Sequence, residues 1–422
     1  MAPALMGQAL EAPETGATAG LGKARYAGRF DPVERPMLNF DFQNPTHIAF
    51  GQGRVADLDH LVPAQARVLI LVGGASAEKN GTLAEVRQAL GARPHATFPG
   101  IEPNPSYETA LRAVQQIREG GFDFLLAVGG GSVIDAAKFI AAAVHVEGDP
   151  WSILEKRGRN IARAMPFGAV LTLPATGSEM NNGSVITHRA KGAKLPFSSA
   201  HCFPRFAVLD PAKTYTLPQQ QLANGVVDAF VHTTEQYLTY PVDALVQDRF
   251  AEGILQTLIE VGPRILAAPE PVYADRANMM WTATLALNGL IGAGVPQDWA
   301  THMIGHELTA LHGIDHARTL AIVLPSLLDE RRVPKRAKLL QYAERVWGLR
   351  EGDEEARISA AIARTRAFFE SLGVPTRLGA YGLGAEHVDA VVAQLEAHGM
   401  VKLGEQRDIT PEVARRILLA AL

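Results

Sequence analysis

The sequence has little of what marks secreted, membrane-bound or nucleic-acid-binding proteins. It contains one cysteine, Cys202, in 422 residues, so no disulfide can form within this chain, and a reducing compartment such as the cytoplasm is expected. No apolar run approaches the ~20 residues that a membrane-spanning helix needs. The net charge of −4 supplies no basic field that would attract nucleic acid. These absences exclude a disulfide-stapled scaffold, a membrane span and a nucleic-acid-binding surface.

The first 36 residues differ in composition from the rest of the chain. The stretch MAPALMGQALEAPETGATAGLG is rich in alanine, glycine and proline and shows no apolar periodicity. It also lacks the basic and apolar regions of a secretory signal. We expect residues 1–36 to be a disordered extension, followed by two domains at 37–216 and 217–422.

Two kinds of apolar pattern divide those domains. Short apolar runs bounded by glycine, proline or aspartate are typical of buried strands. They are RVLILVGG (67–74), FDFLLAVGG (122–130), GAVLTLPAT (168–176) and RFAVLD (205–210), with helical spacing at Tyr107–Glu119 and Val133–Val144. This alternation predicts an α/β domain with a mostly parallel sheet. From Leu217 the spacing is helical with few strand signals, so we expect an all-helical second domain.

A glycine-rich loop follows the second of these strands. The string AVGGGSVID (127–135) continues directly into a helical pattern. Glycines let a ligand approach the backbone, and free N–H groups at a helix start attract anions. The loop therefore predicts a phosphate or diphosphate site, with an ordinary tight turn as the alternative. It has neither the G-x-G-x-x-G spacing nor the lysine of a P-loop.

The loop LVGGASAEKNG (71–81) ends the first strand. Many dinucleotide-binding sheets carry an acidic residue at this point, which accepts the ribose hydroxyls. Here the strand ends at Gly74, and Ser76 and Lys79 would admit a 2′-phosphate, whereas Glu78 argues against one. An ordinary polar turn is the alternative interpretation.

A third loop, LPATGSEMNNGSVIT (173–187), is rich in small and hydroxyl-bearing residues. Thr176 and Ser178 could donate hydrogen bonds to a ribose or a phosphate. Taken alone, such a stretch is more often a plain loop than a binding site.

Histidines gather in two helical regions. The residues concerned are Asp228, His232, His302, His306, His312 and His316. Asp228 and His232 are four residues apart, as are His302 and His306, so each pair shares a helix face. Three imidazoles and a carboxylate suit Fe²⁺ or Zn²⁺, with structural histidines as the alternative. The string HELTALH is not a metalloprotease motif, because His306 and His312 are six residues apart and face different ways.

These motifs, in this order, resemble the iron-containing (group III) alcohol dehydrogenases. The similarity runs from about Met37 to the C-terminus and is greatest to the branch of NADPH-dependent aldehyde reductases and butanol dehydrogenases. It is carried by MLNFDFQNPTHIAFGQG, GIEPNPSYET, AVGGGSVIDAAKFIAAA, LTLPATGSEMN, NGVVDAFVHTTEQY and GVPQDWATHMIGHELTALHGIDHA.

The resemblance implies a set of site residues. The metal ligands would be Asp228, His232, His302 and His316, with His306 beside the nicotinamide and the substrate. The diphosphate would lie against Gly130, Gly131 and Ser132, with Asp135 near the nicotinamide end. The remaining cofactor-binding residues would be Gly74, Ser76 and Lys79 at the 2′-phosphate, Thr172, Thr176 and Ser178 along the cleft, Lys194 at the ribose, and Asn104.

The resemblance also implies the chemistry. NADPH would reduce an aldehyde to a primary alcohol, or run the reverse oxidation, in a homodimer that binds one Fe²⁺ or Zn²⁺ per chain. The proton would come through His306, a ribose hydroxyl or water. A glycerol-dehydrogenase-like polyol oxidoreductase is the alternative enzyme. A non-catalytic, metal-stabilised nucleotide-binding module is the alternative from another class.

Overall fold

The computed structural model describes residues Arg35–Leu422. The predicted extension at 1–36 therefore lies outside the described residues, apart from Arg35 and Pro36. The described residues belong to one compact unit. Within it the secondary structure changes from α/β to helical between the last strand of the sheet and residue 219.

The α/β part is built on a six-stranded sheet in the order β1-β8-β5-β4-β2-β3. Every neighbouring pair in it is parallel, which confirms the predicted α/β fold with a mostly parallel sheet. The strands are β1 (His47–Phe50), β2 (Val68–Val72), β3 (His95–Phe98), β4 (Phe124–Gly130), β5 (Phe167–Leu173) and β8 (Phe206–Leu209). The apolar runs predicted β2, β4, β5 and β8. The two edge strands, β1 and β3, were not predicted from the sequence.

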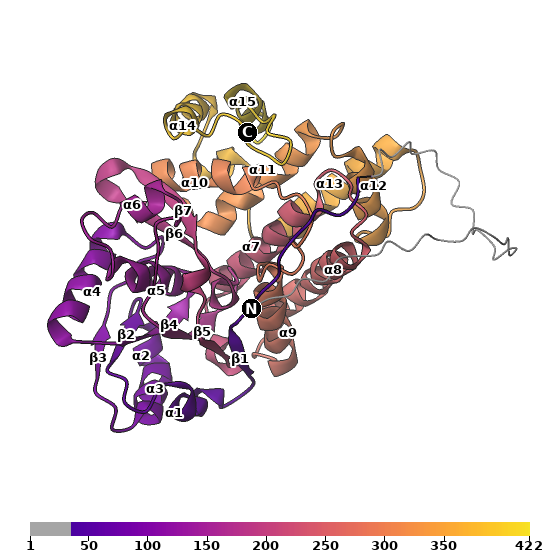
Figure 1. Cartoon of the computed structure of the whole chain (residues 1–422). Coiled ribbons are helices and arrows are strands. Elements are labelled where there is room, and N and C mark those ends of the chain that lie inside the picture. The colour runs from indigo at the N-terminus through magenta and orange to yellow at the C-terminus, as the bar shows by residue number, and fades with distance from the viewer. Residues whose placement is uncertain (1–34) are drawn as a thin grey trace, which may run out of the picture. The chain divides into compact units, whose positions relative to one another are not determined.

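Helices cover both faces of this sheet (Figure 1). Alternate side chains of β2 and β4 belong to different cores: Leu69 and Leu125 pack with α4 (Tyr107–Gly120) and α5 (Gly131–Ala143). Ile70 and Leu126 pack with α3 (Thr82–Leu90) on the other face. Strands buried on both faces explain why the sequence shows continuous apolar runs rather than alternation. The short helices α1 (Leu58–Leu61), α2 (Ser76–Lys79) and α6 (Ser152–Glu155) complete this part.

An antiparallel hairpin extends the α/β part and was not predicted from the sequence. Its strands are β6 (Gly183–His188) and β7 (Ala193–Ser198). β6 packs against α5, and Cys202, just after β7, is fully buried with Sγ 3.8 Å from the Lys138 carbonyl oxygen. Burial raises the pKa of the Cys202 thiol to about 11.

The C-terminal part is helical, as predicted. Its helices are α7 (Gln219–Tyr237), α8 (Leu245–Ala267), α9 (Tyr273–Ala286), α10 (Ala300–His312), α11 (His316–Glu330), α12 (Arg336–Arg345), α13 (Glu354–Ser371), α14 (Ala385–Ala397) and α15 (Pro411–Leu419). α7 is central: it packs against α8, α9, α10, α11 and β5, and every residue from Leu222 to Tyr237 is buried. Among the described helices, none is long and apolar enough to cross a membrane.

Candidate functional site

A cleft of about 1680 Å³ lies where the carboxyl ends of β2, β4 and β5 face α7, α10 and α11. Ligands of open parallel sheets bind at this end of the strands. All but one of the predicted site residues line this cleft: Gly74, Ser76, Asn104, Gly130, Gly131, Ser132, Asp135, Thr172, Thr176, Ser178, Lys194, Asp228, His232, His302, His306 and His316. The exception is Lys79, so its role at a 2′-phosphate stays a prediction with no support from the cleft.

The glycine loop joins β4 directly to α5, whose first turn faces the cleft. A Cβ atom on Gly131 would lie 2.4 Å from Thr176 Oγ1, and one on Gly129 would lie 2.5 Å from Val133 Cγ2. Only glycine fits without displacing these neighbours. The start of α5 therefore offers close backbone approach and unpaired N–H groups to an anion such as a diphosphate.

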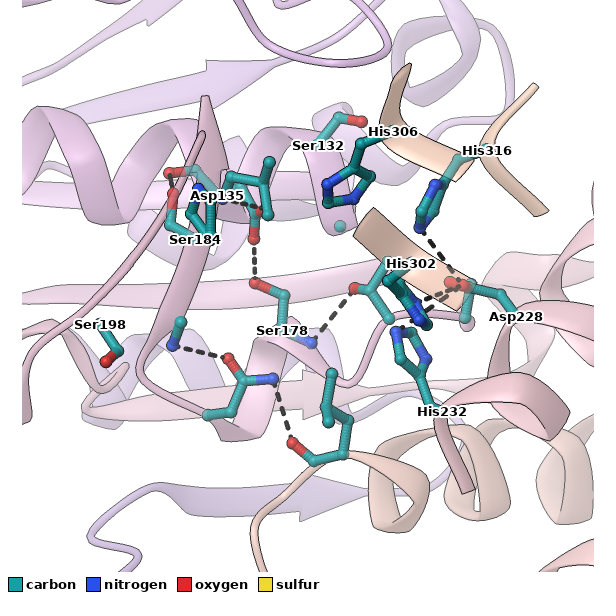
Figure 2. A pocket seen from close by; sticks show the side chains of 18 of the residues that line it. Ser132, Asp135, Ser178, Ser184, Ser198, Asp228, His232, His302, His306 and His316 are labelled. Atoms are coloured by element: carbon teal, nitrogen blue, oxygen red, sulfur yellow. Dashed lines mark hydrogen bonds and ion pairs between the residues drawn. The ribbon is translucent and has the colours of Figure 1, made fainter. Parts of the chain in front are cut away.

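The side chains of Asp135 and Ser178 are hydrogen-bonded to each other. Asp135 Oδ1 accepts a 2.6 Å hydrogen bond from Ser178 Oγ, and Oδ2 accepts one from the Val185 N–H at 2.9 Å (Figure 2). Lys138 was not predicted from the sequence; its buried Nζ donates to Ser178 Oγ at 2.8 Å and to Asn181 Oδ1 at 2.7 Å. Burial lowers the pKa of Lys138 to about 8 and raises that of Asp135. This network holds the loop after β5 against α5 and so shapes the cleft wall.

Lys194, on β7, reaches the cleft from the hairpin. Its Nζ donates to Asn104 Oδ1 at 2.8 Å, and burial lowers its pKa to about 8. Asn104 adopts a left-handed backbone conformation with φ of 56°. Lys194, predicted at the ribose, and Asn104, predicted to bind the cofactor, are thus brought together from two segments that are far apart in the sequence.

Gly74 and Ser76 lie at the end of β2. No atom lies within 4 Å of the position of a Cβ on Gly74, so this point of the cleft is open. Glu78, the residue that argued against a 2′-phosphate, pairs with Arg87 at 3.1 Å and does not line the cleft. Strand β2 therefore ends without a carboxylate facing the cleft.

The predicted metal ligands converge on one point from three helices. Asp228 and His232 lie on α7, His302 on α10 and His316 at the first residue of α11. Asp228 Oδ1 lies 3.7 Å, 4.0 Å and 3.8 Å from the Nε2 atoms of His232, His302 and His316. Figure 2 shows the three imidazoles pointing toward this carboxylate. Ligand atoms of Asp228, His232 and His302 all lie within 4.8 Å of one another.

The chemistry of this cluster fits a divalent metal ion. Asp228 Oδ1 and His302 Nε2 are buried and have no hydrogen-bond partner, an arrangement that is costly unless another group satisfies them. Burial lowers the pKa of His232 and of His302 to about 4 and the pKa of His316 well below its usual value, so all three imidazoles are neutral and carry free lone pairs. Three neutral imidazoles and one carboxylate are a donor set for Fe²⁺ or Zn²⁺. The role of these residues as ligands remains a prediction.

His306 lies beside the cluster. Its ring centroid is 5.1 Å from that of His316 and 6.2 Å from that of His302. Burial lowers its pKa well below the usual value, so it is a neutral imidazole. His312, on the same helix, instead packs against His387 at 5.4 Å and does not line the cleft. The structure thus separates the two histidines of HELTALH.

Glu235 is a polar neighbour of the cluster that the sequence analysis missed. Its carboxylate is hydrogen-bonded to His302 Nδ1 and accepts the Thr301 N–H at 2.7 Å. Its position could have been found, because Asp228, His232 and Glu235 follow the i, i+4, i+7 spacing of one helix face. Carboxylates behind a ligating imidazole fix its tautomer and orientation.

A buried ionic group extends from this neighbourhood. Lys335 Nζ lies 2.7 Å from Asp298 Oδ2 and 3.0 Å from Glu405 Oε2, and it donates to the Leu238 carbonyl oxygen at 2.7 Å. Glu405 belongs to the segment between α14 and α15, which contributes to the lining of the cleft. Lys335 therefore fastens this segment to the start of α10.

Comparison with known proteins gives one consistent result. The family model described as "Iron-containing alcohol dehydrogenase" matches residues 45–211, and "Fe-containing alcohol dehydrogenase family, C-terminal" matches residues 222–422. The chain is 61% identical over 387 residues to the NADPH-dependent aldehyde reductase YqhD of Escherichia coli (strain K12), covering 91% of this chain and 100% of that protein. It is 39% identical to the probable NADH-dependent butanol dehydrogenase 1 of Bacillus subtilis (strain 168), covering 92% and 100%.

Solved structures agree with this result. The substrate- and cofactor-free form of the aldehyde reductase YqhD from E. coli superposes with a TM-score of 0.86 at 60% identity, covering 91% of this chain and 100% of that one. NADH-dependent butanol dehydrogenase A from Thermotoga maritima superposes with a TM-score of 0.88 at 32% identity, covering 92% and 100%.

Proposed function

Because the chain belongs to the iron-containing alcohol dehydrogenase family, we propose that it reduces aldehydes to primary alcohols with NADPH and a divalent metal ion. In this reaction an aldehyde, NADPH and a proton give a primary alcohol and NADP⁺. The observation that carries the proposal is the meeting of two features in one cleft, the glycine loop that starts α5 and the cluster around Asp228. The name of the E. coli relative supports the direction and the cofactor.

Different residues of the cleft would bind the cofactor, bind the metal ion and transfer the proton. The N–H groups at the start of α5 would hold the diphosphate, and Lys194 with Asn104 would hold a ribose. A divalent cation bound by Asp228, His232, His302 and His316 would supply Lewis-acid polarisation of the substrate carbonyl. His306, a neutral imidazole beside this cluster, would pass the proton to the product oxygen. Closing both reactants into one cleft removes much of the entropic cost of their encounter.

The proposal includes a preference for NADPH over NADH. It is supported by the open end of β2 at Gly74, which presents no carboxylate to repel a 2′-phosphate. Relatives named for NADPH and for NADH both occur, at 61% and 39% identity. The higher identity favours NADPH.

We also infer a cytoplasmic homodimer that uses Fe²⁺ or Zn²⁺. The single buried Cys202 supports a reducing compartment, and the donor set suits either metal. The dimer rests on the family resemblance and is tested by the mass of the native protein in solution. The polyol oxidoreductase and the non-catalytic module are not favoured, since the E. coli relative is named as an aldehyde reductase.

The decisive experiment combines metal analysis with steady-state kinetics. Purified protein is loaded in turn with Fe²⁺ and Zn²⁺. The oxidation of NADPH and NADH is followed with a series of straight-chain aldehydes, and the reduction of NADP⁺ and NAD⁺ is followed with glycerol. We expect NADPH oxidation that depends on both metal and aldehyde. Tight NADPH binding without turnover of any aldehyde would contradict the proposal, and a preference for vicinal diols would favour the polyol oxidoreductase.

A further inference from the structure

The four predicted metal ligands are not held in place equally. His232 lies one turn from Asp228 on α7, so a single helix fixes these two relative to each other. His302 comes from α10, and Glu235 holds its ring at Nδ1. His316 has neither support: it lies on α11, and its buried Nδ1 has no hydrogen-bond partner among the described residues. The position of His316 must therefore be set through its backbone.

His316 is also the most exposed of the four. Its side chain is 25% exposed, against 4–6% for Asp228, His232 and His302. Ligand atoms of those three already lie within 4.8 Å of one another, and His316 is the fourth group that faces Asp228. The alignment of His316 is thus what would distinguish a site with four protein ligands from a site with three.

Asp315, the residue before His316, is bound to α7. Its Oδ2 accepts a hydrogen bond from Gln220 Nε2 at 2.9 Å and another from Asn224 Nδ2 at 3.1 Å. Arg318 Nε lies 3.8 Å from the same oxygen, which is too far for a hydrogen bond. The carboxylate makes no capping hydrogen bond to its own helix. The side chain of Asp315 therefore connects the start of α11 to α7.

The two amides that hold Asp315 lie on the face of α7 that carries the metal ligands. Residues four apart follow one another along this face: Gln220, Asn224, Asp228 and His232. Asn224 is buried, with 8% exposure, and lines the cleft. Its contact with Asp315 is made one turn before Asp228. The contact brings the following residue, His316, to Asp228, with Nε2 3.8 Å from Oδ1 (Figure 2).

We propose that Asn224 is a positioning residue for the metal site, because it holds Asp315 and so sets His316 as the fourth ligand. This inference rests on the proposed function and assigns to that site a residue that acts through a ligand. Without the hydrogen bond the start of α11 is held to α7 less firmly, and His316 no longer stays aligned with Asp228. Asn224 is uncharged, so its effect is one of geometry.

The test measures the affinity of the full chain, freed of metal, for Co²⁺ in competition with a chelator. Co²⁺ accepts the imidazole and carboxylate ligands that suit Fe²⁺ and Zn²⁺. Asn224→Leu removes the hydrogen bond at similar volume and unchanged charge. We expect the affinity to fall about tenfold, since residues that orient metal ligands typically contribute 10–100-fold. Asp315→Ala should cost at least as much, whereas Asp315→Asn keeps an acceptor oxygen and should restore most of the affinity.

Thr234→Val is the matched control. Thr234 lies on the same helix, is fully buried and donates to the Phe230 carbonyl oxygen at 2.6 Å, but it does not line the cleft. Its substitution removes a buried hydrogen bond from α7 without touching Asp315. We expect the Co²⁺ affinity of this variant to equal that of the wild type. A fall as large as that of Asn224→Leu would show a general effect of weakening α7 and would overturn the inference.

A second background shows whether Asn224 acts through His316. His316→Ala leaves three ligands and should weaken Co²⁺ binding more than Asn224→Leu does. Adding Asn224→Leu to His316→Ala should then change nothing, because the group that Asn224 positions is gone. An equal fall in both backgrounds would show that Asn224 acts on the metal ion or on Asp228 directly, and the inference would be wrong.

The visible spectrum of bound Co²⁺ gives a readout that a merely structural role would not move, since its intensity depends on the ligands of the ion. At saturating Co²⁺ the spectrum of Asn224→Leu should shift toward that of His316→Ala, and Thr234→Val should keep the wild-type spectrum. These measurements need no turnover, so a lack of reductase activity bears on the proposed function alone. A wild type that binds no Co²⁺ overturns both, whereas binding that depends on His316 and not on Asn224 overturns only this inference.

Discussion

The imidazole of His302 is held between two carboxylates: Nδ1 is hydrogen-bonded to Glu235, and Nε2 faces Asp228 Oδ1 at 4.0 Å. Glu235 therefore fixes the tautomer that offers Nε2 to a metal ion.

Glu235→Gln should weaken metal binding about 10–100-fold, since the amide keeps the shape but loses the charge behind the imidazole. The measurement is metal retention against a competing chelator. Glu252→Gln is the matched control, because Glu252 is buried in a hydrogen-bond network with Tyr237 and does not line the cleft. Equal metal affinity in both variants would contradict the role of Glu235.

His302→Ala should lose bound metal and nearly all reductase activity while the protein still binds NADPH. The substitution removes one of the four predicted metal ligands, whereas the glycine loop that would bind the diphosphate is unchanged. Metal content, turnover and NADPH affinity are measured together. His312→Ala, on the same helix but outside the cleft, should behave as the wild type. Normal metal content in His302→Ala would remove His302 from the predicted ligands.

Gly131→Ala should lower NADPH affinity about tenfold, because the new methyl group must displace Thr176 at the start of α5. NADPH titration by fluorescence gives the change. Gly253→Ala, in α8, places a methyl group where no atom lies within 4 Å and should leave affinity unchanged. If both variants bind NADPH alike, the glycine loop is not the diphosphate site.

Gly74→Asp should erase or reverse the NADPH preference. The new carboxylate would repel the 2′-phosphate of NADPH. Two unit charges ~4 Å apart at an effective dielectric near 20 interact by roughly 4 kcal/mol, and a quarter of this energy is about a fivefold change in affinity. The readout is the ratio of kcat/KM for NADPH and NADH at one salt concentration. Gly74→Asn has the same shape without the charge and should keep most of the preference. A strong NADPH preference that survives Gly74→Asp places the discriminating contact elsewhere.

Lys335→Met should destabilise the fold by about 3–5 kcal/mol, because Asp298 and Glu405 would face each other without a cation. Urea unfolding gives the free energy. The comparison is Arg336→Met, whose pairs with Glu354 and Glu355 are exposed and screened by solvent, so that their loss should cost much less. Similar losses in the two variants would show that the buried group contributes no more than a surface pair.

The sequence predicted the parts of this protein that have a strong local pattern. Strands β2, β4, β5 and β8 are continuous apolar runs because both faces of the sheet are covered. β1 and β3 are edge strands of four residues with partly exposed side chains, so their apolar signal is too short to separate from loop. The hairpin strands β6 and β7 are longer, but they mix polar and apolar side chains, so no continuous apolar run marks them.

At the candidate site, too, the sequence predicts what depends on a local pattern and not what depends on tertiary packing. The spacing of Asp228 and His232 places both on one helix face, which a local pattern can predict. Trp299 has a left-handed backbone conformation with φ of 63°, and the preceding Asp298 meets Lys335 and Glu235 only through tertiary packing. No local pattern contains that information.

Burial of the single thiol gives this protein an internal reporter of unfolding. Cys202 is fully buried behind the hairpin, and its raised pKa keeps it in the unreactive thiol form at neutral pH. A thiol reagent can therefore react only when the packing around α5 opens. The rate of labelling measures how often the cofactor-binding half opens, with no engineered probe, and ligands that close the cleft should slow it.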